Sequence, residues 1–278
     1  MIKCLVSDVD GTLFLDLETP TGIIEPNTIS QVQRLTQSGV RFVMASGRDH
    51  LTARYLESKL QVKVDGIGQN GGVIMIDDEV LISFPLDEKV VNALLDLMDI
   101  TSIDVNILFI DDRGHHVMAK PRGWMYDLFQ LMLERKEITH LYPEDFRTYR
   151  THDHHPVVKA VVICHTMDDR DAFTQEMVEF LSNQDYDWFY SSPQYIEIMS
   201  KNINKGTGVL HLAKVLNLQL DEIAVVGDSY NDISMFKVTP YSFAMDHGDQ
   251  AVKKHANYVV SKVDEVVDFI LKHNETLK

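Results

Sequence analysis

Strand-length apolar segments alternate with helical segments near both ends of this chain of 278 residues. Residues 2–6 and 41–45 are apolar runs, and helical patterns follow them at 28–37 and in a stretch that ends at Leu60. Consecutive strands connected through helices pair in parallel, because the helical crossover returns the chain to the same end of the sheet. The alternation therefore predicts an α/β fold with a Rossmann-like, doubly wound parallel sheet.

The middle of the chain has a different pattern. From residue 67 to residue 199, short strand-like runs separated by turn sequences are mixed with helical stripes, and such a mixture is typical of an α+β module. Beyond residue 199 the alternation of strands and helices resumes. We therefore predict one α/β core domain built from residues 1–84 and 191–278, and an inserted α+β cap domain built from residues 85–190.

Within the insert, the sequence predicts a helix over 125–136 and a loop over the polar stretch 148–156. Several histidines lie in or near such polar stretches, without cysteines or carboxylates at the spacing of zinc ligands. We interpret them as solvated loop residues rather than metal ligands: His115, His116, His152, His154 and His155.

The charge balance narrows the choice of partner. The chain has 42 acidic and 26 basic residues, a formal net charge of −16, and a field of this sign repels nucleic-acid backbones and anionic lipid surfaces. We therefore expect no nucleic acid and no membrane as partner. An anionic small molecule could bind only where a positive group or a metal ion overcomes the field locally.

The sequence also bears on the compartment. No apolar run approaches the roughly 18 residues that span a bilayer, and the first residues lack the long apolar run of a signal peptide. Cys4 and Cys164 each lie inside a strand-like apolar run, which is not the pattern of a disulfide framework. We expect a cytoplasmic protein, and the sequence leaves its oligomeric state open.

Two aspartates follow the first predicted strand, in Asp8-Val9-Asp10-Gly11-Thr12. Ligands of open parallel sheets bind outside the carboxyl ends of the strands, and Gly11 allows the chain to turn sharply there. One carboxylate beside an electrophile can act as a nucleophile. A second carboxylate held nearby can give a proton to a leaving oxygen and later take one from water. The two aspartates therefore predict group-transfer chemistry at the carboxyl edge of the parallel sheet.

Three further stretches follow in chain order: Ser46-Gly47-Arg48 after the second core strand, Lys205 at a helix start, and Gly227-Asp228-Ser229-Tyr230-Asn231-Asp232 after another strand. With the aspartate pair, they resemble the four motifs of the haloacid dehalogenase superfamily of phosphotransferases. The insert lies between the second and third motifs, as in the Cof-type subfamily, and Glu197-Ile198-Met199 resembles a Cof-type sequence ahead of the third motif.

The resemblance implies a catalytic set of Asp8, Asp10, Ser46 and Lys205. Asp8 would attack phosphorus and form an aspartyl-phosphate, while Asp10 would protonate the departing alcohol and then deprotonate water. The Lys205 ammonium can neutralise phosphate and nucleophile together. A cation is disfavoured at a helix start, which favours a functional role for this lysine.

The same residues suggest how phosphate and metal are held. The Ser46 hydroxyl and the Gly47 N–H suit a phosphate oxygen, although Ser-Gly alone also fits a plain helix cap. The expected phosphate-binding set is Val9, Gly11, Thr12, Ser46, Gly47, Lys205 and Asn231. Converging carboxylates repel one another unless a divalent cation lies among them, so we expect Mg²⁺ on Asp8, Asp10 and Asp228. Asp232 would orient metal-bound water or a phosphate oxygen.

Asn70-Gly71-Gly72 fits two interpretations. A similar Asn-Gly turn in Cof-type proteins implies a loop that faces the substrate. Alternatively, the same residues form a good hairpin turn without any functional role.

We therefore expect a Mg²⁺-dependent phosphatase that hydrolyses small phosphomonoesters, with sugar phosphates implied by the resemblance. A phosphomutase is the nearest alternative, but it would need clustered arginines to grip a bisphosphate, and the arginines of the insert are scattered. A glycosyltransferase with an Asp-x-Asp metal site would leave Lys205 and Gly227-Asp228 unexplained. A non-catalytic ligand-binding protein on this scaffold would not need both Asp8 and Asp10.

Overall fold

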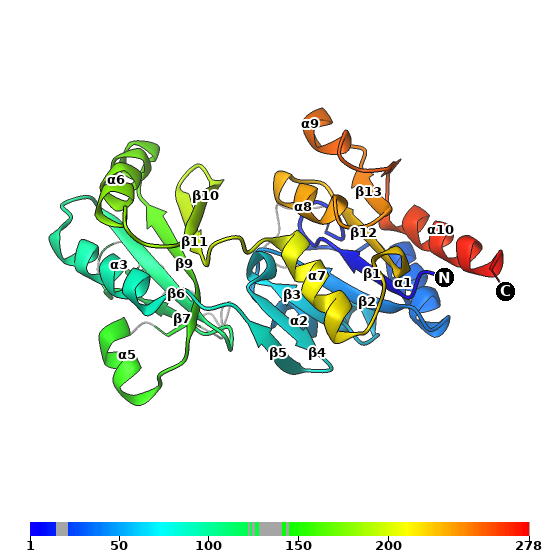
Figure 1. The fold of residues 1–278 in the computed structure, drawn as a ribbon, viewed down its shortest axis with the longest axis horizontal. Helices are drawn as coiled ribbons and strands as arrows, with labels where there is room; N and C mark the ends of the chain where they lie inside the picture. The colour runs from blue at the N-terminus through cyan, green and yellow to red at the C-terminus, as the bar shows by residue number, and fades with distance from the viewer. Residues whose placement is uncertain (15–21, 122, 124–125, 128–140, 143–144, 278) are drawn as a thin grey trace. The chain divides into compact units, whose positions relative to one another are not determined.

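A computed structural model describes residues 1–14, 22–121, 123, 126–127, 141–142 and 145–277 (Figure 1). The chain divides into two compact units. The core unit comprises Met1–Ile82 and Asn204–Lys278, and the second unit comprises Ser83–Ile203. The predicted helix over 125–136 lies almost entirely outside the described residues. Among the described residues, no helix is both long enough and apolar enough to cross a membrane.

The core unit contains one sheet of eight strands in the order β14-β13-β12-β1-β2-β3-β4-β5. The strands from β14 to β3 pair in parallel, and β3 pairs antiparallel with β4. Their bounds are β1 Cys4–Ser7, β2 Arg41–Ala45, β3 Asp65–Gly68, β4 Val73–Ile76, β5 Glu79–Ser83, β12 Ile223–Gly227, β13 Tyr241–Met245 and β14 Tyr258–Val260. The central strand β1 lies between β12 and β2, so its carboxyl end is surrounded by the ends of its neighbours.

Helices cover both faces of this sheet. One face packs on α1 (Pro26–Gln37), α2 (Thr52–Leu60) and α10 (Val263–Glu275), and the other packs on α7 (Lys205–Val215), α8 (Ile233–Phe236) and α9 (Gln250–Lys253). Successive β1 residues alternate between the faces: Leu5 packs in the first cluster, whereas Cys4 and Val6 pack in the second. Burial on both faces explains the continuous apolar run. The predicted doubly wound α/β sheet is confirmed.

The second unit contains a mixed sheet of six strands in the order β10-β11-β9-β6-β7-β8. All its pairs are antiparallel except β7 with β8. The strand bounds are β6 Val105–Asp111, β7 His116–Met118, β8 Leu141–Tyr142, β9 Val157–Cys164, β10 Asp187–Ser192 and β11 Tyr195–Met199. The helices α3 (Glu88–Ile100), α5 (Phe146–His152) and α6 (Met167–Phe180) share one apolar cluster with this sheet.

The predicted boundary between residues 190 and 191 falls inside β10. In the structure the second unit continues to Ile203. The reason is pairing: β10 pairs with β11, and β11 pairs along its whole length with β9, which belongs to the second sheet. The hairpin therefore cannot belong to the core sheet, although its apolar pattern resembles that of a core strand.

The predicted loop over 148–156 is wrong in its first half, because α5 covers Phe146–His152. The Asp145 side chain accepts a hydrogen bond from the Arg147 N–H and caps the helix start. Phe146 and Tyr149, three residues apart on one helical face, are both buried. Burial of these two aromatic side chains, together with the Asp145 cap, stabilises this short polar segment as a helix.

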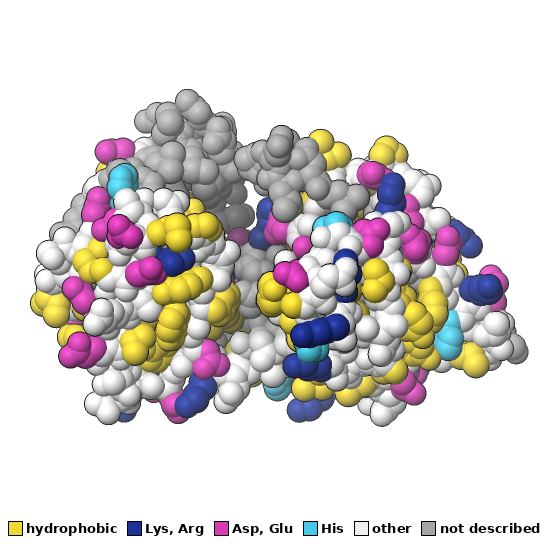
Figure 2. Space-filling model, turned by 90° about the horizontal axis from the view of Figure 1, so that it is seen from above, with side chains coloured by type: hydrophobic (Ala, Val, Ile, Leu, Met, Phe, Trp, Pro, Cys, Tyr) yellow, Lys and Arg dark blue, Asp and Glu magenta, His cyan; other side chains and the backbone are white. Residues whose placement is uncertain are grey.

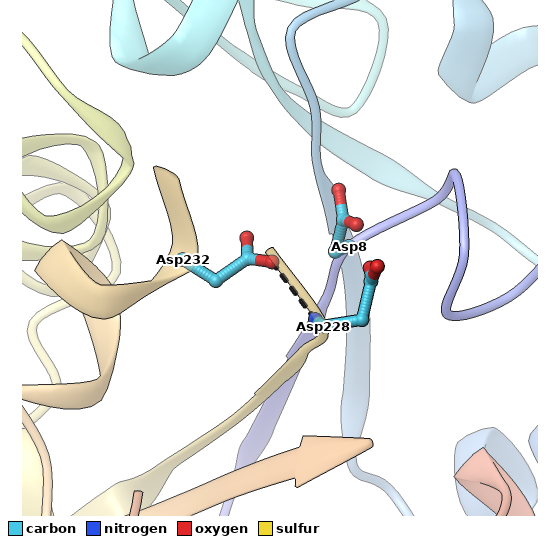
Figure 3. Close-up of side chains that lie close together, drawn as sticks. All are labelled: Asp8, Asp228 and Asp232. Carbon is cyan, nitrogen blue, oxygen red and sulfur yellow. Dashed lines mark hydrogen bonds between the residues drawn. The ribbon is translucent and has the colours of Figure 1, made fainter. Parts of the chain in front are cut away.

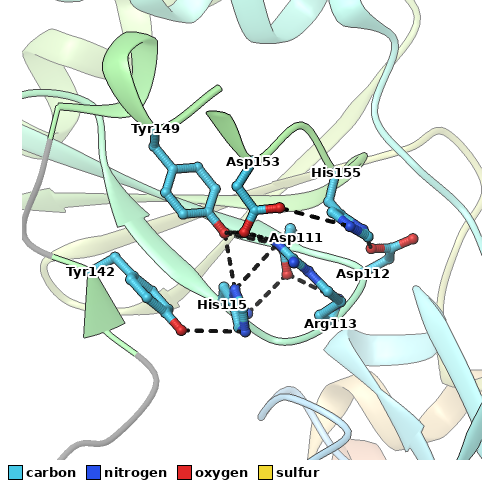
Figure 4. A network of polar contacts seen from close by, with 8 residues as sticks. All are labelled: Asp111, Asp112, Arg113, His115, Tyr142, Tyr149, Asp153 and His155. Carbon is cyan, nitrogen blue, oxygen red and sulfur yellow. Dashed lines mark hydrogen bonds and ion pairs between the residues drawn. The ribbon is translucent and has the colours of Figure 1, made fainter. Parts of the chain in front are cut away.

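Two of the histidines, His115 and His155, also belong to a polar network (Figure 4). His115 Nδ1 lies 2.9 Å from the Tyr149 hydroxyl, and His155 Nδ1 lies 3.0 Å from an Asp112 carboxylate oxygen. Both residues lie in loops, as expected, but their rings have polar protein partners besides solvent. His152 and His154 are exposed, as expected. Partners from α5 and the β6–β7 turn, which are distant in sequence, create the network.

Candidate active site

The centre of the candidate site is the carboxyl end of β1. Asp8 follows β1 directly, and Asp228 follows the neighbouring parallel strand β12 directly. Gly11 packs directly against Asp228, and its φ is +83°. No side chain fits at this position, because a Cβ would lie 2.5 Å from an Asp228 carboxylate oxygen. The Thr12 hydroxyl donates a hydrogen bond of 3.0 Å to the other oxygen of that carboxylate. The turn after β1 therefore fixes Asp228 beside Asp8.

Lys205 brings a positive charge to this edge from the first turn of α7. The Asn204 side chain caps α7 by accepting from the Thr207 N–H. The Lys205 side chain is 1% exposed, and its Nζ donates to one oxygen of Asp8 and one of Asp232, each at 2.6 Å. These two carboxylates outweigh the unfavourable helix dipole.

Asp232 lies in the 3₁₀ turn η3 (Tyr230–Asp232) and is fully buried. Its second oxygen accepts the backbone N–H groups of Asp228 and Ser229, each at 2.9 Å. Both oxygens are thus engaged, one by Lys205 and one by the loop after β12. Asp232 therefore holds the lysine and the Asp228 loop in place, as Figure 3 shows for the Asp228 contact.

Three carboxylates, those of Asp8, Asp228 and Asp232, each offer an oxygen within 4.8 Å of the others. Burial, followed by the charge of Asp232, raises the pKa of Asp8 well above its usual value. Burial likewise raises the pKa of Asp232. Burial alone would lower the pKa of Lys205, but the charges of Asp232 and Asp8 outweigh it and raise that pKa. The cluster holds more negative charge than its lysine neutralises.

This donor set fits a hard divalent cation. Carboxylate oxygens are the ligands that Mg²⁺ prefers, and the excess negative charge would be relieved by it. Asp232 is fully buried and accepts three hydrogen bonds, from Lys205 and from two backbone N–H groups, whereas each oxygen of Asp228 accepts only one hydroxyl, from Thr12 or Ser229. Asp8 and Asp228 are therefore the residues that would hold the ion. Asp228 is oriented for this by the Thr12 hydroxyl and by the Gly11 turn.

The carboxylate of Asp10 lies outside this cluster. It accepts two hydrogen bonds from Arg48, from Nε to Oδ2 at 2.8 Å and from Nη2 to Oδ1 at 2.6 Å. Among the described residues, the Asp10 side chain is not one of the carboxylates that converge with Asp8 and Asp228, so side-chain ligation of a metal by Asp10 stays a prediction. The sequence alone assigns Arg48 no role in the site. The sequence feature that could have indicated the pair is the position of Arg48, a cation two residues after Ser46 in a chain with more acidic than basic residues.

Ser46 and Gly47 follow β2, the other neighbour of β1. The Ser46 hydroxyl accepts from the Arg48 N–H at 3.1 Å. The loop is held by Asn70, whose N–H donates to the Ser46 carbonyl at 2.8 Å and whose side-chain oxygen accepts from the Asn231 amide at 3.1 Å. Because Ser46 belongs to the second motif and Asn231 to the fourth, these contacts of Asn70 join the two motifs.

The two interpretations of Asn70 can now be compared. Its φ is +52°, and it is buried within the 3₁₀ turn η1 (Gln69–Gly71). A Cβ on Gly47 would lie 3.2 Å from the Asn70 amide nitrogen. Asn70 therefore packs against the second motif and is more than a plain turn residue. Val9 contributes through its backbone, since its carbonyl accepts the Leu13 and Phe14 N–H groups and shapes the turn after β1.

Solved structures of similar fold cover nearly the whole chain. A haloacid dehalogenase-like hydrolase from Bacteroides thetaiotaomicron matches with a TM-score of 0.80 at 23% identity, covering 97% of this chain and 100% of that one. A protein from Thermotoga maritima matches with a TM-score of 0.80 at 21% identity, covering 96% and 97%. At such identities the likeness establishes the fold alone.

Curated relatives extend the comparison to sequence. A putative phosphatase of Buchnera aphidicola is 25% identical over 287 residues, covering 100% of this chain and 99% of the relative. A 5-amino-6-(5-phospho-D-ribitylamino)uracil phosphatase of Bacillus subtilis is 24% identical over 281 residues, covering 95% and 94%. A model of the haloacid dehalogenase-like hydrolase family matches residues 5–270. The resemblance seen in the four motifs is thus confirmed, and this chain belongs to the family of haloacid dehalogenase-like hydrolases.

Proposed function

We propose that this hydrolase is a Mg²⁺-dependent phosphatase that cleaves small phosphomonoesters through an aspartyl-phosphate on Asp8. The observation that carries the proposal is the position of Asp8. Asp8 follows the central strand and is 4% exposed, and its carboxylate shares one cluster with the Lys205 ammonium and two further carboxylates. Such an arrangement suits a nucleophile that meets a dianionic phosphoryl group.

The first step is attack by a carboxylate oxygen of Asp8 on phosphorus, which breaks the bond between phosphorus and the ester oxygen. Lys205, hydrogen-bonded to Asp8 at 2.6 Å, holds the nucleophile in place and stabilises the negative charge of the transferred group. Mg²⁺ bound on Asp8 and Asp228 would supply further positive charge to the phosphoryl oxygens.

The second step releases phosphate. Asp10, which gave its proton to the departing ester oxygen in the first step, now takes a proton from water. The water oxygen bonds to phosphorus, the bond from Asp8 to phosphorus breaks, and inorganic phosphate leaves. The Ser46 hydroxyl and the Gly47 N–H, at the end of β2, are placed in this proposal to bind the phosphoryl oxygens.

The substrate class follows from the relatives and from the charge. Curated relatives of Bacillus subtilis and Escherichia coli are named as phosphatases of 5-amino-6-(5-phospho-D-ribitylamino)uracil, a phosphorylated sugar alcohol on a small ring. A net charge of −16 disfavours polyanionic macromolecules. We therefore place the substrate among small sugar and sugar-alcohol phosphates.

The test is phosphate release from a panel of hexose phosphates, pentose phosphates and the ribitylaminouracil phosphate, with Mg²⁺ present. We expect Asp8→Asn to lower the rate by at least about 10³-fold, since a carboxamide is a poor nucleophile. Asp111→Asn provides a matched control, because Asp111 is equally buried but lies in the second unit. Turnover by Asp8→Asn at the wild-type rate would contradict the proposal.

The covalent step has its own readout. Borohydride added during turnover reduces an acyl phosphate to an alcohol, which would convert Asp8 to homoserine. Mass spectrometry of the peptide that contains residue 8 should show this change only with substrate present. If the peptide stays unmodified while phosphate is released, hydrolysis proceeds by direct attack of water and the aspartyl-phosphate is wrong.

A further inference from the structure

Arg48 and Asp10 form a bidentate ion pair at a partly exposed position. The two side chains are 36% and 39% exposed, and pairs at such positions generally contribute little to stability. This pair is nevertheless bidentate, with both carboxylate oxygens of Asp10 held by one guanidinium. A planar fork of this kind restricts the orientation of the carboxylate as well as its distance.

Arg48 is itself held at three points. Its N–H donates to the Ser46 hydroxyl at 3.1 Å, and its carbonyl accepts from the Gln69 N–H at 2.8 Å. Its guanidinium lies over the Phe14 ring, 5.7 Å from the ring centre. The end of β2, the turn η1 and the turn after β1 therefore together determine where this side chain lies.

Phe14, which contacts Arg48, also pairs with the backbone of Asp10. The Phe14 carbonyl accepts the Gly11 N–H at 2.9 Å, and Phe14 pairs with Asp10 in an isolated β-bridge. Phe14 is 1% exposed and packs in a hydrophobic cluster of the core unit. A buried ring thus supports the arginine that grips Asp10, and the same turn carries the backbone of Asp10.

We propose that Arg48 is the positioning residue of Asp10. By fixing the plane of the carboxylate relative to the Ser46–Gly47 loop, it directs Asp10 to the ester oxygen of a phosphoryl group bound at that loop. This inference rests on the proposed function, because it assigns Arg48 to the proton transfer made by Asp10. Arg48 itself forms and breaks no covalent bond.

A positioning role predicts dependence on the leaving group. Alkyl esters leave as basic alkoxides and need the proton from Asp10, whereas 4-nitrophenolate leaves readily without it. Misplacing a catalytic group by about 1 Å can cost on the order of 10²-fold in rate. Loss of the fork should therefore slow hexose phosphate hydrolysis much more than 4-nitrophenyl phosphate hydrolysis.

The experiment compares Arg48→Lys, which keeps the charge and loses the fork, and Arg48→Gln, which loses both. For the hexose phosphate we expect kcat to fall about 10- to 100-fold with KM little changed, and for 4-nitrophenyl phosphate we expect a fall below about 3-fold. Arg54→Gln is the matched control, since Arg54 is an exposed core-unit arginine 3.6 Å from Asp78. Circular dichroism and urea unfolding establish that each variant folds.

A double-mutant cycle tests whether Arg48 acts through Asp10. In an Asp10→Asn background, Arg48→Lys should cause no further loss, because the group that it positions is already inactive. Equal losses on both esters, an effect on KM alone, or additive losses in the cycle would overturn the inference while leaving the proposed function intact. A wild-type protein inactive on every ester would overturn the proposed function, and this inference with it.

Discussion

Each unit contains a buried aspartate, and the two differ in how their charge is compensated. In the second unit, one oxygen of Asp111 accepts the N–H groups of Arg113 and His115, and the other accepts two bonds from the Arg113 guanidinium. In the core unit, Asp8 accepts from Lys205, which it shares with Asp232, and Asp228 lies in the same cluster. The charge of Asp111, in the second unit, is compensated within the fold, whereas the charge of the cluster at Asp8, in the core unit, is not.

The difference separates a structural group from a functional one. Asp111 ties the β6–β7 turn to α5 through Arg113 and Tyr149, and such fully paired networks stabilise and rigidify a fold (Figure 4). The cluster at Asp8 holds three carboxylates against the ammonium of Lys205, and this unmatched negative charge costs stability until a cation binds. On the face that Figure 2 shows, Asp and Glu side chains are scattered over the surface, where water compensates them.

The largest effect should come from removing Lys205, whose ammonium pairs with two carboxylates of the Asp8 cluster. Lys205→Ala leaves Asp8 and Asp232 buried without their partner, and breaking a buried pair in this way costs about 3–5 kcal/mol. Urea unfolding at pH 7 with a chelator present measures it. Lys201→Ala is the matched control, because Lys201 pairs with Asp185 on the surface, and no change is expected there. Equal effects of the two variants would show that the cluster is not under charge strain.

Mg²⁺ should stabilise the core unit specifically. A ligand at 100 times its dissociation constant adds about 2.7 kcal/mol of stability, and the ion neutralises charge that the fold leaves unmatched. Thermal unfolding with and without Mg²⁺ measures the gain. Asp228→Asn should abolish it, whereas Asp111→Asn should retain it. A gain that survives in Asp228→Asn would place the ion elsewhere.

Asp111→Asn should destabilise the second unit by about 2 kcal/mol, because charge-assisted hydrogen bonds from Arg113 are lost and an amide N–H₂ faces other donors. Chemical denaturation followed by circular dichroism checks the value. Asp104→Asn, an exposed aspartate in the same unit, is the control and should be neutral. If Asp111→Asn is neutral as well, the network of Figure 4 contributes nothing to stability.

The smallest expected effect has the opposite sign. Because the pKa of Asp8 is raised by burial and by Asp232, the fold favours its protonated form, and ionisation costs stability as the pH rises above about 4. Asp8→Asn should therefore stabilise the metal-free protein by about 1 kcal/mol at pH 7.5, with less gain at pH 4.5. Unfolding free energies at both pH values, measured with a chelator, test this. A loss of stability at pH 7.5 would mean that the Lys205 contact outweighs the burial.

The sequence by itself determined the parallel core and the meeting of Asp8 with Asp228. Alternation of strands and helices requires parallel pairing, and parallel strands bring residues just beyond their carboxyl ends to one edge. Ser46 could be placed for the same reason, at a strand end, whereas Lys205 was assigned to the site by its resemblance to the third motif. The α/β class and the order of the four motifs needed no knowledge of contacts.

Only the tertiary structure decided which sheet the hairpin β10–β11 joins, because strand pairing depends on a partner distant in sequence, here β9. The same holds for α5, which two buried aromatic residues stabilise, and for the bond between Arg48 and Asp10 across the site. Local patterns specify which segments are strands or helices and which way their side chains alternate. They do not specify which charged side chains meet, because that depends on how distant segments pack.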